Sequence, residues 1–223
     1  MTSTKTATSS PNQQTHYNQL AGQSTERLAG ISDGIFAVAM TLLVLGLAVP
    51  AVDKVHTESD LAGALLALVP SFVTYTMSFL TAGIFWVGHQ TQISQLQSSD
   101  RNLAWIYLVF LLFVTLLPFS TQLLARFIEL RVALLVYWFN IALLGLALYA
   151  SANYALRMHF FRGTDEEQRM IVKLLRRRIY VAQALYAGAT VLCVFSTYLS
   201  IGLIVLVQLN YVIAPPIPIL RRL

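Results

Sequence analysis

The sequence predicts an all-α integral membrane protein with six transmembrane helices per chain. Of its 223 residues, 57% are hydrophobic and only 11% are charged, which is too much apolar surface for one soluble core of ordinary composition. Long apolar runs alternate with clusters of charge, and each run is long enough to cross hydrocarbon as a helix. The six expected spans are residues 29–50, 62–88, 103–125, 131–156, 179–199 and 200–218.

Proline and glycine residues suggest where some of these spans bend or end. The third span contains Leu117-Pro118-Phe119, where the proline is expected to kink or stop the helix. Between the last two spans, residues 198–202 offer only a tight turn, and the sixth apolar run ends at Pro215 and Pro216, where a helix does not easily continue. One long helix in place of the last two spans is therefore an alternative.

Two polar segments lie outside the expected spans. Residues 1–23 are rich in Ser, Thr, Gln and Asn, so we expect a disordered cytoplasmic tail without a cleavable signal peptide, followed by a six-helix membrane domain at residues 24–223. The second segment, about residues 157–178, is expected to be a cytoplasmic linker, with three acidic residues ahead of a basic cluster. It fits either a helix near anionic headgroups or a solvated charged linker.

The distribution of Lys and Arg predicts the orientation, because positive residues are retained on the cytoplasmic side of a membrane. With six spans, the external loops keep only Lys54, Arg126 and Arg131. The cytoplasmic segments carry Lys5, Arg27, Arg101, Arg157, Arg162, Arg169, Lys173, Arg176, Arg177, Arg178, Arg221 and Arg222. Both termini are therefore expected in the cytoplasm. The net charge of +5 follows from this bias, so nucleic-acid binding is not indicated.

The first span has one distinctive face. At about 100° per residue, six side chains fall on one stripe: Ile31, Gly34, Val38, Thr41, Leu42 and Leu45. Such a stripe is typical of an ordinary helix–helix contact in a membrane. Alternatively, four such helices around an axis would form a narrow tube, in which a ring of Thr41 hydroxyls interrupts aliphatic rings.

Asp33 lies about 140° from this stripe on the same helical wheel, so we expect it to turn toward its own subunit. An ionisable side chain near hydrocarbon usually has a partner and often a function. The second span carries Trp86-x-x-His89 near the same membrane boundary, and we expect a bond from His89 to Asp33 that locks the first helix. Arg101 and Asn102 are further candidate partners. His89 could instead carry protons.

Three segments resemble one known family. Arg27-x-x-x-Ile31-Ser32-Asp33 is similar to the R-x-x-x-F-S-D motif of the transmembrane protein 175 potassium-channel family, with Ile31 in place of the motif's phenylalanine. Trp86-x-x-His89 and Leu117-Pro118-Phe119 resemble that family's patterns too, and Gly34 agrees with many bacterial members. The residues assigned by resemblance to a structural motif network are Arg27, Ile31, Ser32, Asp33, Gly34, Trp86, His89 and Asn102.

The resemblance implies a bacterial homotetramer in the plasma membrane, whose first helices line a central potassium pathway without a cofactor. Its partners are then potassium ions and the lipid bilayer. It places the constriction at Val38, further layers at Leu42 and Leu45, and the threonine associated with selectivity at Thr41. The helical wheel, which used no family knowledge, puts these four residues on one stripe.

Three functional hypotheses follow. The leading one is a passive, moderately potassium-selective cation channel. The chain has no Thr-Val-Gly-Tyr-Gly filter, so selectivity would come from a narrow aliphatic tube with hydroxyl help. A proton-coupled secondary transporter that uses Asp33 and His89 is the alternative. A membrane enzyme is disfavoured, because the sequence contains no H-E-x-x-H pair and no G-x-S-x-G elbow.

Overall fold

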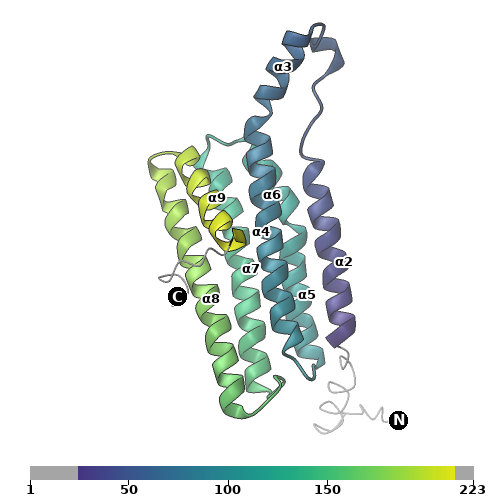
Figure 1. The fold of residues 1–223 in the computed structure, drawn as a ribbon, viewed down its shortest axis with the longest axis vertical. Coiled ribbons are helices and arrows are strands. Elements are labelled where there is room, and N and C mark those ends of the chain that lie inside the picture. The colour runs from purple at the N-terminus through teal and green to yellow at the C-terminus, as the bar shows by residue number, and fades with distance from the viewer. Residues whose placement is uncertain (1–24, 214–223) are drawn as a thin grey trace, which may run out of the picture.

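The computed structural model describes residues 25–213, which form a bundle of α-helices that run alternately up and down (Figure 1). The expected tail at residues 1–23 and the end of the expected sixth span lie outside the described residues. The helices are α2 (Thr25–Val44), α3 (Glu58–Ala67), α4 (Val69–Ser94), α5 (Arg101–Thr115), α6 (Leu117–Arg126), α7 (Arg131–Arg157), α8 (Asp165–Val191) and α9 (Thr197–Ile213). Short 3-10 turns lie at Val52–Lys54 and Leu192–Val194.

Several of these helices are suited to a bilayer. Within the described residues, α2, α4, the combined α5–α6 segment and α7 are long and apolar enough to cross a membrane, by length and composition. Helix α8 has 27 residues, but its first half is charged, and α9 is apolar with 17 residues. The chain is therefore an all-α protein with several apolar spans, while the count of six crossings stays a prediction.

The first two spans differ from their expected bounds. Helix α2 begins at Thr25 and ends at Val44, so it starts and stops earlier than residues 29–50. The second span is divided at Leu68 into α3 and α4. Pro70 lies in the first turn of α4. The N–H groups of a first turn have no carbonyl acceptor within the helix, so the missing N–H of proline removes no hydrogen bond there.

The third span breaks beside Pro118, as its sequence predicts. Helix α5 ends at Thr115, and α6 begins at Leu117 with Pro118 in its first turn. The hydroxyl of Thr121 donates to the Leu117 carbonyl at 2.7 Å, and that of Ser120 donates to the same carbonyl at 3.1 Å. These side chains stabilise the bend that the proline imposes.

Most of the expected linker and the fifth span form one continuous helix, α8, and the cytoplasmic location of the linker stays a prediction. Helix α8 begins with a capping box, in which Thr164 and Glu167 satisfy each other's backbone N–H groups. No proline or glycine follows until Gly188, so nothing stops the helix at the change from charged to apolar residues.

The last two spans are separate helices, and the alternative of one fused helix is wrong. Helix α8 ends at Val191, and the chain turns through Leu192–Val194 before α9 begins at Thr197. The turn therefore lies before Tyr198 and not within residues 198–202. Helix α9 then packs back between α8 and α4.

Packing leaves one side of α2 uncovered. Helix α2 contacts α4, α5 and α6, while α7 lies between α5, α6 and α8.

The starts of α2, α5 and α8 lie at the same end of the bundle as the ends of α4 and α7 (Figure 1). At that end, Leu96 and Phe161 are fully buried and pair the α4–α5 loop with the α7–α8 loop. This corner holds the ends of four helices together.

Candidate functional site

Helix α2 presents two faces of different character. Its buried residues are Ser32, Phe36, Ala39 and Leu43, which recur every three or four residues and so form one face of the helix. The large apolar side chains of the stripe lie on the other side and are exposed in the single chain, with exposed fractions of 48% for Ile31, 57% for Val38, 42% for Leu42 and 71% for Leu45. Gly34 and Thr41 are exposed between them. The stripe is therefore a continuous, largely apolar surface that the subunit itself does not cover.

Thr41 is the one hydroxyl residue in that stripe. Its Oγ1 donates to the backbone carbonyl of Val38 at 2.8 Å. A hydroxyl has one proton and two acceptor positions, so this bond uses the proton and leaves the oxygen lone pairs available. The side chain thus presents an acceptor oxygen at the exposed surface of α2.

Asp33 is held by the neighbouring helix α4. The indole Nε1 of Trp86 donates to Asp33 Oδ1 at 2.8 Å, and Nε2 of Gln90 donates to the same oxygen. Gln90 was not expected from the sequence, although it is one turn after Trp86 and so shares its face of the helix. Two donors from α4 therefore fix the rotation of α2 at this end of the bundle.

His89 bonds to Ser32, so the expected bond from His89 to Asp33 is wrong. His89 Nε2 lies 2.8 Å from Ser32 Oγ, and both side chains are fully buried. The Ser32 hydroxyl donates its one proton to the Leu28 carbonyl at 2.8 Å. Ser32 must then accept from His89, which requires the tautomer that carries its proton on Nε2.

Aromatic rings enclose the imidazole of His89. Its ring stacks on Phe110 with centroids 4.8 Å apart, and it meets the edge of Tyr107 at 4.9 Å. Phe36 of α2 lies 6.4 Å away. His89 thus packs as a core side chain between α2, α4 and α5, and within residues 25–213 its Nδ1 has no hydrogen-bond partner.

Asn102 belongs to a hydrogen-bonded cluster that is separate from those of Asp33 and His89. Its Nδ2 donates to the Tyr154 hydroxyl at 3.1 Å, and that hydroxyl donates to Asp100 Oδ2 at 2.7 Å. Asp100 also caps the start of α5 through Leu103 N. Asn102 therefore joins α5 to α7 and is not a partner of Asp33, contrary to the expectation. Arg27 and Arg101 are exposed at the same end of the bundle.

A groove runs along the exposed face of α2. It has a volume of about 360 Å³ and is lined by Ile31, Gly34, Val38 and Leu42 of the stripe and by Thr115 of α5, together with Ile35 and Ala39. The lining is almost entirely apolar. Among the described residues, no three His, Cys, Asp or Glu side chains gather as a metal site requires.

The apolar helices and the uncovered face of α2 define a helical membrane protein that leaves one apolar surface for a partner. Residues 27–118 match the family described as "Endosomal/lysosomal potassium channel TMEM175". A potassium channel of Chamaesiphon minutus is 33% identical over 184 residues, which cover 80% of this chain and 88% of the relative. The chain belongs to the TMEM175 family, which is a family of ion channels and not of enzymes.

Other relatives match over different parts of their length. A potassium channel of Streptomyces collinus is 39% identical over 103 residues, which cover 46% of this chain and 48% of the relative. The human endosomal/lysosomal proton channel TMEM175 is 28% identical over 203 residues, which cover 83% of this chain and 39% of that protein. The structure also resembles the crystal structure of a lysosomal potassium-selective channel TMEM175 homolog from Chamaesiphon minutus. The TM-score is 0.74 at 28% identity, and the match covers 85% of this chain and 97% of the other.

Proposed function

We propose that this protein is a passive, potassium-preferring cation channel that assembles as a homotetramer in a plasma membrane. In this proposal α2 lines the central pathway, α2 to α9 make six crossings, and both termini face the cytoplasm. The observation that carries the proposal is the stripe on α2, which points away from its own subunit in a chain of an ion-channel family.

The aliphatic side chains of the stripe would form the constriction. Val38, Leu42 and Leu45 are spaced so that each is about one turn from the next, and each is exposed in the isolated subunit. Around a four-fold axis these side chains would form stacked aliphatic rings. A narrow apolar constriction of this kind closes by dewetting and excludes hydrated ions by size.

Thr41 would supply a hydroxyl oxygen that contacts the permeating ion between the aliphatic rings. Because its proton is used by the Val38 carbonyl, its oxygen can only accept, which suits a cation and not an anion. Four weak oxygen ligands replace only part of a hydration shell, so the selectivity for potassium over sodium is expected to be moderate.

The part of the groove at Gly34, Ile35 and Thr115, away from the pore-facing side chains, would receive the neighbouring subunit. Gly34 lies in its wall, and small residues allow the backbones of membrane helices to approach closely. Apolar side chains on both sides of Gly34 would then pack against the neighbour. This packing would bring the four copies of α2 around one axis.

The bi-ionic reversal potential of the purified protein in liposomes tests the proposal. With potassium on one side and sodium on the other, we expect a passive current that reverses at a potential favouring potassium. In Val38→Ala, Leu42→Ala and Leu45→Ala, we expect a wider pathway, a larger conductance and a reversal potential shifted toward zero. Val44→Ala is the matched control, since Val44 is 47% exposed on the same helix but lies off the stripe. Unchanged conductance and selectivity in all three stripe variants would contradict the pore assignment.

The same liposomes distinguish a channel from a proton-coupled transporter. The transporter hypothesis needs a relay between Asp33 and His89, but these side chains have different hydrogen-bond partners, which are Trp86 and Gln90 for Asp33 and Ser32 for His89. We therefore expect no uphill potassium flux when only a pH gradient is applied. Uphill flux in that assay would favour the transporter.

A further inference from the structure

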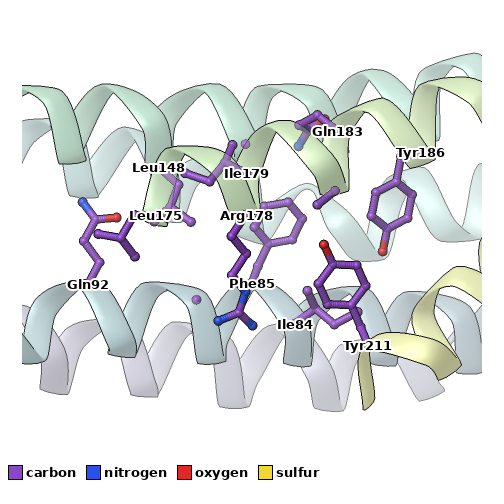
Figure 2. A pocket seen from close by; sticks show the side chains of 13 residues that line it. Ile84, Phe85, Gln92, Leu148, Leu175, Arg178, Ile179, Gln183, Tyr186 and Tyr211 are labelled. Atoms are coloured by element: carbon purple, nitrogen blue, oxygen red, sulfur yellow. The ribbon is translucent and has the colours of Figure 1, made fainter. Parts of the chain in front are cut away.

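A cleft lies between α4 and α8 where α9 ends (Figure 2). Helix α8 has 27 residues and α9 has 17, so at 1.5 Å per residue they are about 40 Å and about 25 Å long. Helix α9 packs against both α8 and α4, and its described residues fill part of the groove between them. Tyr211, near the end of α9, closes one end of the cleft that remains.

The cleft is lined mainly by hydrocarbon. Phe85 of α4, Leu148 of α7, and Leu175, Ile179 and Ala182 of α8 are among its lining residues, and Gly145 of α7 also lies in the lining. The cleft has a volume of about 50 Å³ and is open on one side. A surface of this kind at the outside of a membrane bundle suits an alkyl chain.

Arg178 gives the cleft a cationic group. Figure 2 shows its side chain reaching from α8 toward α4, between the Gln92 end of the cleft and the Tyr211 end. On α8 it is the last of a run of cations that includes Lys173, while the acidic residues of this helix lie in its first turn. The charge around the cleft is therefore positive, and its complement is an anion.

Gln92 closes the end of the cleft that lies toward the end of α4. The side chain is fully buried, and its Nε2 donates to Ser151 Oγ at 2.8 Å. Its Oε1 has no hydrogen-bond partner among residues 25–213, and Figure 2 shows this oxygen directed into the cleft near Leu175. The side chain therefore forms a polar wall at this end of the cleft and is not itself open to an occupant.

The polar and apolar lining residues of the cleft lie at different expected depths in the membrane, as the two parts of an amphiphile do. The apolar part of α8 begins at Ile179, directly after Arg178, and a cationic side chain at such a change marks the level where hydrocarbon meets headgroups. Gln92 lies near the end of α4, two residues before Ser94, on the headgroup side of Arg178. Ile179, Ala182 and Phe85 lie on the hydrocarbon side.

We propose that this cleft binds one anionic glycerophospholipid of the phosphatidylglycerol type. The first part of one acyl chain lies against Ile179, Ala182 and Phe85, and the lipid phosphate accepts hydrogen bonds from Arg178. Phosphatidylcholine has no net charge, so the site selects phosphatidylglycerol over phosphatidylcholine. This lipid site is independent of the proposed conduction pathway.

Native mass spectrometry of the full chain, in detergent with equal amounts of phosphatidylglycerol and phosphatidylcholine, tests the selection. We expect the wild type to retain phosphatidylglycerol preferentially. A charge-assisted hydrogen bond is strong enough that Arg178→Gln should reduce this preference about tenfold. Arg169→Gln is the matched control, because it removes the same charge from an exposed position of α8 that does not line the cleft, and its preference should stay unchanged.

Two further measurements locate the lipid. Ala182→Phe fills the cleft without changing charge, and we expect it to weaken phosphatidylglycerol retention as much as Arg178→Gln does. In the wild type, a phosphatidylglycerol with a photoreactive group in its acyl chain should label peptides that contain Leu148 or Ile179. This labelling needs no variant, so it remains informative even if a variant fails to fold.

Three results would overturn the proposal. Equal losses in Arg178→Gln and Arg169→Gln would mean that only the total charge matters. Photolabelling of other helices alone would place the lipid elsewhere. A chain ending at Ile213 that binds phosphatidylglycerol when the full chain does not would show that residues 214–223 are the occupant.

Discussion

Asp33 and Ser32 are adjacent in sequence but serve two separate contacts with α4. The carboxylate of Asp33 accepts from Trp86 and Gln90, while the Ser32 hydroxyl meets the buried ring of His89. Because successive residues of a helix point about 100° apart, the two sets of hydrogen bonds contact α2 from different directions. Together they determine which face of α2 is left exposed.

Asp33→Ala is therefore expected to damage assembly before it alters ion preference. It removes the acceptor of the hydrogen bonds from Trp86 Nε1 and Gln90 Nε2, each of which contributes about 0.5–1.5 kcal/mol, and it allows α2 to rotate. The measurements are the tetramer fraction by size-exclusion chromatography with light scattering and the midpoint of thermal unfolding. Asp33→Asn is the control, since its amide oxygen can still accept from Trp86. Its tetramer fraction and its midpoint of thermal unfolding should fall less than those of Asp33→Ala. A stable Asp33→Ala tetramer whose ion preference changes sharply would instead put Asp33 on the conduction route.

Polar side chains join the apolar helices to one another in the middle of the bundle. Gln208 of α9 donates to Thr81 at 2.7 Å and to the Tyr186 hydroxyl at 3.2 Å. Thr81 also bonds to the Tyr137 hydroxyl at 2.8 Å. Gln208, Thr81 and Tyr137 are buried, and in hydrocarbon such bonds add directional attraction that apolar contacts lack.

Gln208→Leu is expected to loosen α9 without unfolding the bundle. Hydrogen bonds between membrane helices contribute about 0.6–2 kcal/mol each, and this variant removes two. Hydrogen–deuterium exchange should rise in α9 and stay unchanged in α7. Asn210→Leu is the matched control, since it also removes an amide from α9 at a half-buried position outside the network. Equal exchange in α9 for both variants would mean that the network does not hold this helix.

At the scale of the whole molecule, the subunit has an apolar face on α2 that its own helices leave uncovered. The stripe on α2 lies on the opposite side of that helix from its contacts with α4. In the proposed tetramer these stripes face one another around the axis. Residues of α7, which does not border α2, would lie farther out.

Cysteine crosslinking tests this arrangement. In a Cys193→Ser background, which removes the one native thiol, Val38→Cys should form disulfide-linked dimers on mild oxidation because four copies would meet near the axis. Phe139→Cys is the control, since Phe139 on α7 is 58% exposed, similar to Val38 at 57%. Monomers alone at Val38, or equal crosslinking at both positions, would argue against a tetramer built around α2.

The sequence by itself determined the features that depend on neighbouring residues. Hydropathy identified the apolar runs, Pro118 marked the break between α5 and α6, and the spacing along α2 separated the exposed stripe from the buried face. These properties arise within one or two helical turns, so the chain carries them before any helix meets another. Family membership was also recognisable from the motif at residues 27–34.

Only the tertiary structure decided which distant side chains meet. The sequence placed His89 near Asp33, but the rotation and axial position of α4 against α2 bring His89 to Ser32 and Gln90 to Asp33. Asn102 likewise meets Tyr154 and not Asp33. A change of one residue in register turns a side chain by about 100°, and packing across more than fifty residues of chain sets that register. The cleft beside Tyr211 is lined by residues from four helices, α4, α7, α8 and α9, so it too depends on packing and could not be predicted from the sequence.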